Sequence, residues 1–249
     1  MNKRDKIELI KNIVEQEFLD ITKSIIPTEV DKLSLGTSGF YLNSIFELLH
    51  SLNILLSEGL IESAGSVATS LWERSITLQY FLTNHIEFAN IISTHKKYKK
   101  TPWNIKEMVI GIVNSENHKE RDPEIMKDLL YIQYSYLCAI KHGNPYTLSY
   151  LNRLEKNTKS VIGLNPNFTE EDWDIKNYLQ LISLTLAFES LLKFSSVFCT
   201  NEKYSKLKII NLDITTTIVR DIKLNVPQII TTTSEEFREE FWEYLKGLK

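Results

Sequence analysis

Four side chains that could take part in chemistry recur along residues 124–142, a stretch whose apolar periodicity predicts one helix. They follow one another at steps of four, three and four, and at about 100° per residue they share one helical face: Tyr131, Ser135, Cys138 and His142. The face expected to be buried lies opposite and consists of Met126, Leu130, Gln133, Leu137 and Ile140. Because tyrosine, cysteine and histidine are only partly polar, the first face is typical of a groove or an interface.

His142 lies at the C-terminal end of this predicted helix, where the helix dipole favours a protonated imidazole. It could serve as a general acid or base. The alternative is a helix-capping histidine, since Gly143 follows at a position typical of a C-cap. A thiolate–imidazole pair of Cys138 with His142 is a weaker alternative, because a single cysteine on a helix usually behaves as a small apolar residue.

A second group of candidate residues is the sequence Trp72-Glu73-Arg74, inside the apolar stretch 61–82. Measured from the leucines that define the buried side of that predicted helix, Arg74 lies at the boundary and Glu73 points nearly opposite. A boundary arginine can reach into a cleft and bind phosphate oxygens, with Trp72 screening it from water. The alternative is an ordinary ion pair between two helices.

The third candidate is a basic run around one tyrosine, in which Lys96, Lys97, Lys99 and Lys100 flank Tyr98. Such a run can contact phosphates while the tyrosine stacks on a base. The alternative is a lysine-rich helix end that complements the helix dipole.

Asn43, Glu47 and His50 form a further alignment, at positions i, i+4 and i+7. His50 could support the site near His142. A plain solvated helix face explains the same spacing.

Composition limits the classes of function. The 249 residues carry a formal net charge of −3, which excludes a globally basic nucleic-acid binder and requires any polyanion to meet a local basic patch. Two cysteines and five histidines without ligand spacing predict neither a disulfide framework nor a metal site, and we expect no cofactor. The chain lacks an N-terminal apolar signal core, and no apolar run reaches the roughly 18 residues of a membrane span, so we expect a cytoplasmic protein.

The elements that must position these residues are predicted to be helices throughout, which makes the fold class all-α. We expect helices at about 5–26, 40–56, 61–82, 84–100, 101–113, 124–142 and 169–199, with a loop at 36–39 and a turn at Gly59. The helix at 169–199 is apolar nearly all round and should be central. Residues 205–233 leave helix, strand and irregular chain open, and an acidic helix is expected to follow to about residue 245. We divide the chain into a bundle domain, 1–200, and a C-terminal extension, 201–249.

The stretch 64–82, together with the stretch 134–143 some fifty residues later, resembles an uncharacterised bacterial helical family that is similar to the HEPN superfamily. The resemblance covers about residues 40–155. It implies a HEPN-like antiparallel bundle with a C-terminal extension. It also implies a metal-independent endoribonuclease of a toxin–antitoxin or anti-phage defence system, with its groove formed across a homodimer.

The chain departs from the pattern of the catalytic members in one respect. Those enzymes carry an arginine, four to six residues and then the histidine on one helix, and the corresponding positions here are Leu137, Tyr136 and Ser135. Either the site is degenerate, or Arg74 supplies the guanidinium from a neighbouring helix.

These residues support two main hypotheses of function. In the first, the protein is an RNA-targeting defence or toxin protein with a neutralising or effector partner. His142 is then the acid or base, Arg74 the phosphate clamp, and Glu73, His50, Ser135 and Tyr131 support them. In the second, it is a non-catalytic helical module that dimerises or binds a partner protein. A weaker third is the binding of a nucleotide or another small ligand in the same cleft.

Overall fold

The computed structural model describes residues 2–26, 31–94, 103–115 and 170–218, together with residues 127, 130, 131, 133–135, 137, 138 and 141. In this part of the chain every element is a helix, apart from one isolated antiparallel bridge between Ile25 and Cys199. The elements are α1 (Lys3–Asp20), the 3₁₀ helix η1 (Ile21–Ser24), α2 (Lys32–Ser57), α3 (Ile61–Phe81), α4 (His85–Thr94), α5 (Ile105–Ser115), α8 (Glu170–Phe198) and α9 (Asn201–Thr217). The prediction of an all-α protein is confirmed, and the HEPN-like arrangement stays a prediction.

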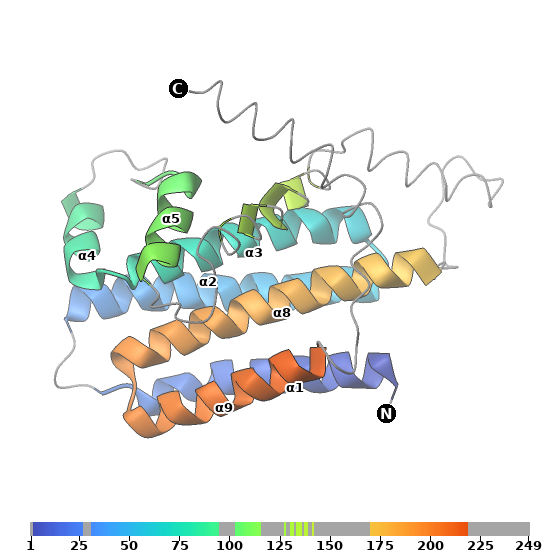
Figure 1. The fold of residues 1–249 in the computed structure, drawn as a ribbon, viewed down its shortest axis with the longest axis horizontal. Helices are drawn as coiled ribbons and strands as arrows, with labels where there is room; N and C mark the ends of the chain where they lie inside the picture. The colour runs from blue at the N-terminus through green and yellow to red at the C-terminus, as the bar shows by residue number, and fades with distance from the viewer. Residues whose placement is uncertain are drawn as a thin grey trace.

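The helix α8 lies at the centre of the bundle and contacts α1, α2, α3 and α9 (Figure 1). Leu184, Phe188 and Leu191 lie on one side of this helix and Leu179 on the opposite side, and all four are fully buried, as the sequence predicted for a central helix. The segment Lys176–Phe198 is long and apolar enough to cross a membrane by length and composition, but 67% of its most apolar window is buried inside the protein. A core helix meets the same criterion.

The helix α2 begins earlier than the sequence predicted. We expected a loop at 36–39 and a helix from Phe40, whereas the structure has α2 running from Lys32 through both glycines of that stretch. The Asp31 carboxylate caps the helix by accepting a hydrogen bond from the Ser34 backbone N–H at 2.7 Å. Ser34 is fully buried and donates its hydroxyl to the His85 carbonyl at 3.0 Å. The cap and this contact with α4 offset the helix penalty of about 1 kcal/mol for a glycine.

The tight turn at Gly59 makes α2 and α3 neighbours. Gly59 has φ 76°, which favours glycine, and it closes the predicted turn that places α2 beside α3.

The helix α5 begins at Ile105, later than predicted from Thr101 and Pro102. Asn104 and Glu107 explain this start, because each accepts a backbone N–H from the other as a capping box.

Two backbone hydrogen bonds join the segment that follows α1 to the junction of α8 and α9. The Ile26 N–H donates to the Phe198 carbonyl at 3.0 Å, and the Thr200 N–H donates to the Ser24 carbonyl at 3.1 Å. Residues 205–217, whose conformation the sequence left open, belong to α9, and Leu207 of this helix is fully buried. The domain boundary at residue 200 stays a prediction, and the acidic helix expected near the C-terminus lies outside the described residues.

Candidate functional site

The helix that carries the predicted chemical face packs against α3, as predicted. Among its described residues, Tyr134 stacks on Trp72 with ring centroids 4.6 Å apart, and its hydroxyl donates to Glu73 Oε1 at 3.1 Å. One turn away, the Thr69 hydroxyl donates to the Leu137 carbonyl at 3.1 Å. Tyr134 therefore sits at the centre of the contact, although the sequence did not single it out.

The face of the 127–141 segment that meets the core is wider than predicted, because it includes Leu130 and Leu137, as expected, and also Tyr131. Tyr131 is only 7% exposed and Leu137 is fully buried, while Cys138 is half-buried. The prediction that Tyr131 lies opposite the buried face is wrong, whereas the half-buried Cys138 lies at the edge of that face. The Tyr134 ring stacks on Trp72, and Tyr131 and Cys138, three and four residues away, lie on the same side of the helix as this ring. Ser135, at the edge of the face, is half-buried.

Glu73 also differs from its prediction, because it faces the 127–141 segment and accepts the Tyr134 hydroxyl. Trp72 is fully buried, so its ring is closed to solvent and unable to stack on a nucleic-acid base. The side chain expected to screen Arg74 from water is instead the partner of Tyr134.

Cys138 lies within hydrogen-bonding reach of Tyr134. Burial raises the pKa of the Cys138 thiol; the Tyr134 hydroxyl lowers it, and the nearby Glu73 carboxylate raises it again. Burial, Cys138 and Glu73 all raise the pKa of Tyr134. Both groups are therefore protonated at neutral pH, which suits a hydrogen-bonded contact and not a thiolate nucleophile.

Arg74 points from α3 towards α2. Its guanidinium carbon lies 5.9 Å from the centre of the Tyr41 ring, and Tyr41 is 7% exposed. The ion pair that the sequence offered as an alternative for Arg74 is not formed with any carboxylate of the described residues. Glu73 and Arg74, although adjacent, thus contact different helices.

The remaining predicted site residues divide into two groups. His50 is exposed on α2, where Asn43 Nδ2 donates to Glu47 Oε1 at 2.8 Å, so this alignment is a solvated helix face. The others lie outside the described residues, and their placement relative to Arg74 stays a prediction: His142, Lys96, Lys97, Tyr98, Lys99 and Lys100.

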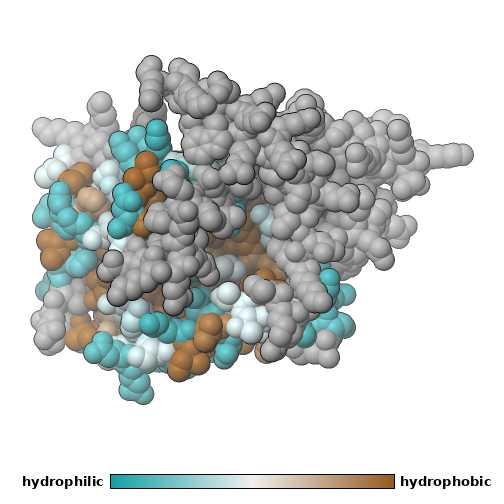
Figure 2. All heavy atoms as spheres, in the orientation of Figure 1, coloured by the Kyte–Doolittle hydropathy of each residue, from teal (hydrophilic) through white to brown (hydrophobic). Residues whose placement is uncertain are grey.

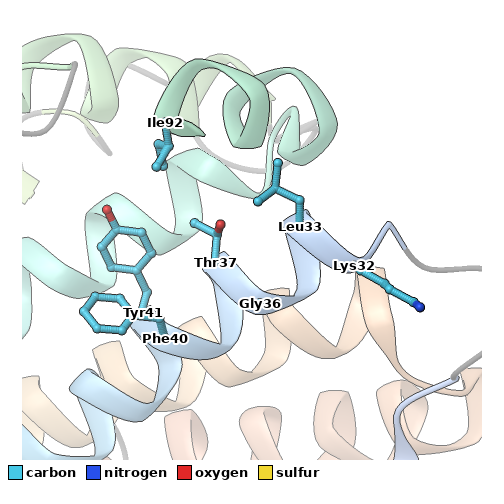
Figure 3. Close-up of a pocket in the computed structure, with 7 residues that line it drawn as sticks. All are labelled: Lys32, Leu33, Gly36, Thr37, Phe40, Tyr41 and Ile92. Carbon is cyan, nitrogen blue, oxygen red and sulfur yellow. The ribbon is translucent and has the colours of Figure 1, made fainter. Parts of the chain in front are cut away.

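A shallow groove of about 410 Å³ lies between the first turns of α2 and the end of α4 (Figure 3). Its lining consists of Lys32, Leu33, Gly36, Thr37, Phe40, Tyr41 and Ile92. Phe40 is 66% exposed. Figure 2 shows other hydrophobic side chains at the surface in separate places among hydrophilic ones. We did not predict this groove from the sequence, because we expected a loop at residues 36–39. The spacing of Leu33 and Phe40 nevertheless places both side chains on one helical face.

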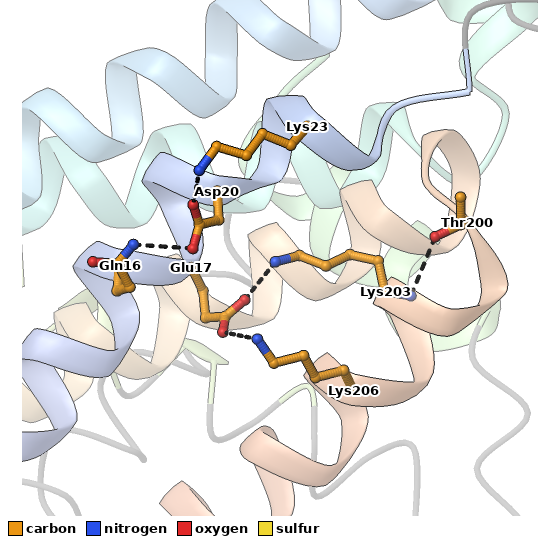
Figure 4. A network of polar contacts seen from close by, with 7 residues as sticks. All are labelled: Gln16, Glu17, Asp20, Lys23, Thr200, Lys203 and Lys206. Atoms are coloured by element: carbon orange, nitrogen blue, oxygen red, sulfur yellow. Dashed lines mark hydrogen bonds and ion pairs between the residues drawn. The ribbon is translucent and has the colours of Figure 1, made fainter.

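A buried ion pair joins α1 to α9 (Figure 4). Glu17 accepts hydrogen bonds from Lys203 Nζ at 2.5 Å and from Lys206 Nζ at 2.7 Å, and the Glu17 and Lys203 side chains are 7% and 8% exposed. Burial by itself raises the pKa of Glu17, but the two lysines together hold it below its ordinary value. The only sequence signal was a glutamate directly before Phe18 on an apolar helix face, with no indication of its partner.

Within the described part of the chain no three His, Cys, Asp or Glu side chains come together as metal ligands. Comparison of the chain with protein-family models, with curated proteins and with solved structures finds no match. The function of the protein must therefore be inferred from the geometry of the described residues.

Proposed function

We propose that this protein is a non-catalytic helical module that binds a partner protein or a second copy of itself. One observation carries the proposal. Three chemically capable side chains of the described site are engaged in packing contacts: Tyr134 joins its helix to α3 through Glu73 and Trp72, and Cys138 contacts Tyr134 one turn along the same helix.

These contacts stabilise the packing of helices within the protein and leave few of the polar side chains free to act on a substrate. A general base must be free to take a proton from its substrate, whereas Glu73 already accepts the Tyr134 hydroxyl. A nucleophilic cysteine needs a depressed pKa, whereas the Cys138 pKa is raised.

The test is an assay of fluorescent single-stranded RNA cleavage in the presence of EDTA, comparing the full-length protein with His142→Ala. We expect no cleavage above buffer for either protein. Glu73→Ala should instead lower the melting temperature, because it leaves the Tyr134 hydroxyl without its acceptor. Cleavage by the wild type that His142→Ala removes without a change of melting temperature would refute the proposal.

The second candidate is a HEPN-like RNA-targeting protein of a toxin or defence system. One observation favours it: Arg74 is half-buried and has no carboxylate partner among the described residues, so its guanidinium keeps hydrogen-bond donors for a phosphate. In this proposal His142 supplies the acid or base, and the protein acts as a homodimer.

Charge reversal tests this candidate independently of cleavage. Replacing Lys96, Lys97, Lys99 and Lys100 by Glu should abolish retention on RNA at low salt and leave the melting temperature nearly unchanged. Arg74→Ala by itself should also weaken RNA binding. Equal RNA retention by all these variants and the wild type would remove the support for the candidate.

A further inference from the structure

We infer that the contact of His85 with α2 and α8 is pH-sensitive, and that protonation of its imidazole releases α4 from the bundle. This inference goes beyond the proposed function and does not depend on it. His85 is the first residue of α4 and lies at the junction where this helix meets the start of α2 and the end of α8.

Two contacts hold His85 in this junction. Its ring forms a T-shaped contact with the Phe198 ring of α8, with centroids 5.4 Å apart and 69° between the planes. Its carbonyl accepts the Ser34 hydroxyl of α2 at 3.0 Å. Phe198 is 1% exposed and Ser34 is fully buried, so a movement of His85 opens a contact that is closed to water.

The His85 ring is placed for the neutral form. Its Nδ1 atom is buried and has no hydrogen-bond partner among the described residues. A neutral imidazole can keep Nδ1 unprotonated, whereas the imidazolium carries an N–H there. A buried donor without an acceptor is unfavourable, and the Phe198 side chain has no acceptor atom. The N-terminal end of the α4 dipole also disfavours a cation at this position.

Asp31, at the start of α2, is the acidic residue whose charge acts on His85. It favours protonation of the imidazole, but burial has the larger effect and lowers the pKa of His85 below its ordinary value of 6.5. The Asp31 carboxylate is already engaged, because it caps α2 by accepting the Ser34 backbone N–H at 2.7 Å. A protonated His85 therefore gains Asp31 as a hydrogen-bond partner only if the cap of α2 is given up.

The other titratable groups near the junction leave this balance unchanged. Glu87, two residues further along α4, already accepts a side-chain hydrogen bond. Cys199, at the end of α8, keeps its proton at neutral pH, because burial raises its pKa to about 11. Lys32 is exposed, and its side chain points away from Ile92 of α4 (Figure 3).

The helix α4 can leave the bundle without unfolding its centre. Of its ten residues, all of them described, only Ala89 is fully buried, and Ile86 is 56% exposed. A helix that buries so little apolar surface opens locally at a small cost. The open state binds a proton at the ordinary pKa of 6.5, and the closed state binds it only at a lower pH. Opening should therefore increase as the pH falls through 6.5 and level off below the pKa of the closed state.

Hydrogen exchange of the α4 amides measures this opening. The full-length protein is exchanged at pH 7.5 and at pH 5.5, and each rate is divided by the intrinsic rate at that pH. The opening constant of α4 should rise by about three- to ten-fold at the lower pH, since one group with an ordinary pKa of 6.5 allows no more.

His85→Phe keeps a ring against Phe198 and removes the titrating group, so the opening constant should differ by less than about 1.5-fold between the two pH values. His50→Phe is the matched control. It makes the same change at an exposed position of α2 and should keep the wild-type response.

Two further measurements do not depend on the folding of His85→Phe. Asp31→Asn keeps a capping side chain and removes the charge that favours protonation, so its acid-induced opening of α4 should be no smaller than that of the wild type. An NMR titration of the wild-type imidazoles should give His85 a midpoint below 6.5.

Four results would overturn the inference. They are equal opening of α4 at both pH values, a wild-type response that persists in His85→Phe, a smaller response in Asp31→Asn, and a His85 midpoint at or above 6.5.

Discussion

Tyr134 combines three interactions in one side chain: a stack on Trp72, a hydrogen bond to Glu73 and a contact with Cys138. Such a cluster fixes the rotation of one helix against another, because the ring and the hydroxyl must be satisfied together. It also explains why Tyr131 turns inwards, where burial raises its pKa to about 12. At the scale of single residues, the described part of the candidate site therefore stabilises the packing of one helix on another.

Tyr134→Phe isolates the hydrogen bond from the stack. We expect this change to lower the free energy of unfolding by about 1–2 kcal/mol, because the Glu73 carboxylate loses a donor at a half-buried position. Urea denaturation followed by circular dichroism measures it. Tyr204→Phe on α9 is the control and should change stability by less than about 0.5 kcal/mol. An unchanged Tyr134→Phe midpoint would assign the whole contribution to the ring.

Substitutions at Gly111 and at Gly36 should change the stability of the protein in opposite directions. A Cβ at Gly111 would lie 2.2 Å from Tyr80 Cε2, and the Tyr80 ring packs in a cluster with Phe88 and Trp103, which also contact each other. We expect Gly111→Ala to lower the melting temperature, at a cost of about 1–3 kcal/mol. Gly36→Ala should raise stability by up to about 1 kcal/mol, because its Cβ meets nothing and alanine is the better helix former. Equal melting temperatures for the two variants would contradict the close approach at Gly111.

At the scale of the helices, α1 and α9 are joined by a charge pair that is as buried as their apolar contacts. A buried carboxylate is costly to remove from water, and Glu17 is stable there because Lys203 and Lys206 both donate to it. Lys206 is 58% exposed and adds less than Lys203, whose side chain is 8% exposed. The pair fixes the register of α9 on α1.

Removing one partner of this pair should be more harmful than removing both. Glu17→Gln leaves the Lys203 charge buried without its counter-charge, and we expect a loss of roughly 3–5 kcal/mol of unfolding free energy. The double variant Glu17→Leu with Lys203→Met should recover most of it. Lys206→Ala, the exposed control, should cost less than about 1 kcal/mol. Denaturation of all three variants under one condition provides the comparison, and a double variant that is no more stable than Glu17→Gln would show that the pair is not coupled.

The same pair predicts a dependence on pH. Because the pKa of Glu17 in the folded protein is lower than its ordinary value of 4.5, its contribution is complete above about pH 4.5 and is lost as the pH falls through the depressed folded value. The difference in melting temperature between wild type and Glu17→Gln should therefore be constant from pH 7 to pH 5 and should shrink below that. A difference that grows on acidification would have the wrong sign.

At the scale of the whole molecule, α8 holds the bundle together, since it contacts α1, α2, α3 and α9 and is buried on nearly all sides. The helices α4 and α5 cover one end of the bundle and make fewer contacts with other elements (Figure 1). Local openings of such peripheral helices expose little apolar surface, whereas an opening of α8 requires the other long helices to separate.

Hydrogen exchange of backbone amides should be slowest in α8 and faster in α4 and α5. Amides in the middle of α8, around Leu184 to Leu191, should exchange only with the free energy of global unfolding, while those of α4 and α5 should exchange several orders of magnitude faster. Exchange measured by mass spectrometry on peptic peptides resolves these segments. Faster exchange in α8 than in α4 would show that the centre of the fold lies elsewhere.

The sequence alone determined the features that depend on local chemistry. Apolar spacing predicted the helices, the apolar circumference of residues 169–199 predicted a central position, and Gly59 predicted the turn between α2 and α3. It also predicted that the 124–142 stretch packs on α3, and Thr69, Trp72 and Glu73 confirm this through Leu137 and Tyr134. These features follow from periodicity and backbone preference, which act over a few residues.

Only the tertiary structure decided which partner each side chain meets. Gly36 and Gly39 look like loop residues until the Asp31 cap and the burial of Ser34 are known. Helical periodicity places Tyr131, Tyr134 and Cys138 around an axis, but the stack on Trp72 sets the rotation about that axis. Glu17 and Lys203 are 186 residues apart, so no local pattern could pair them. Their pairing is a matter of which helices become neighbours, and burial of the whole core settles that.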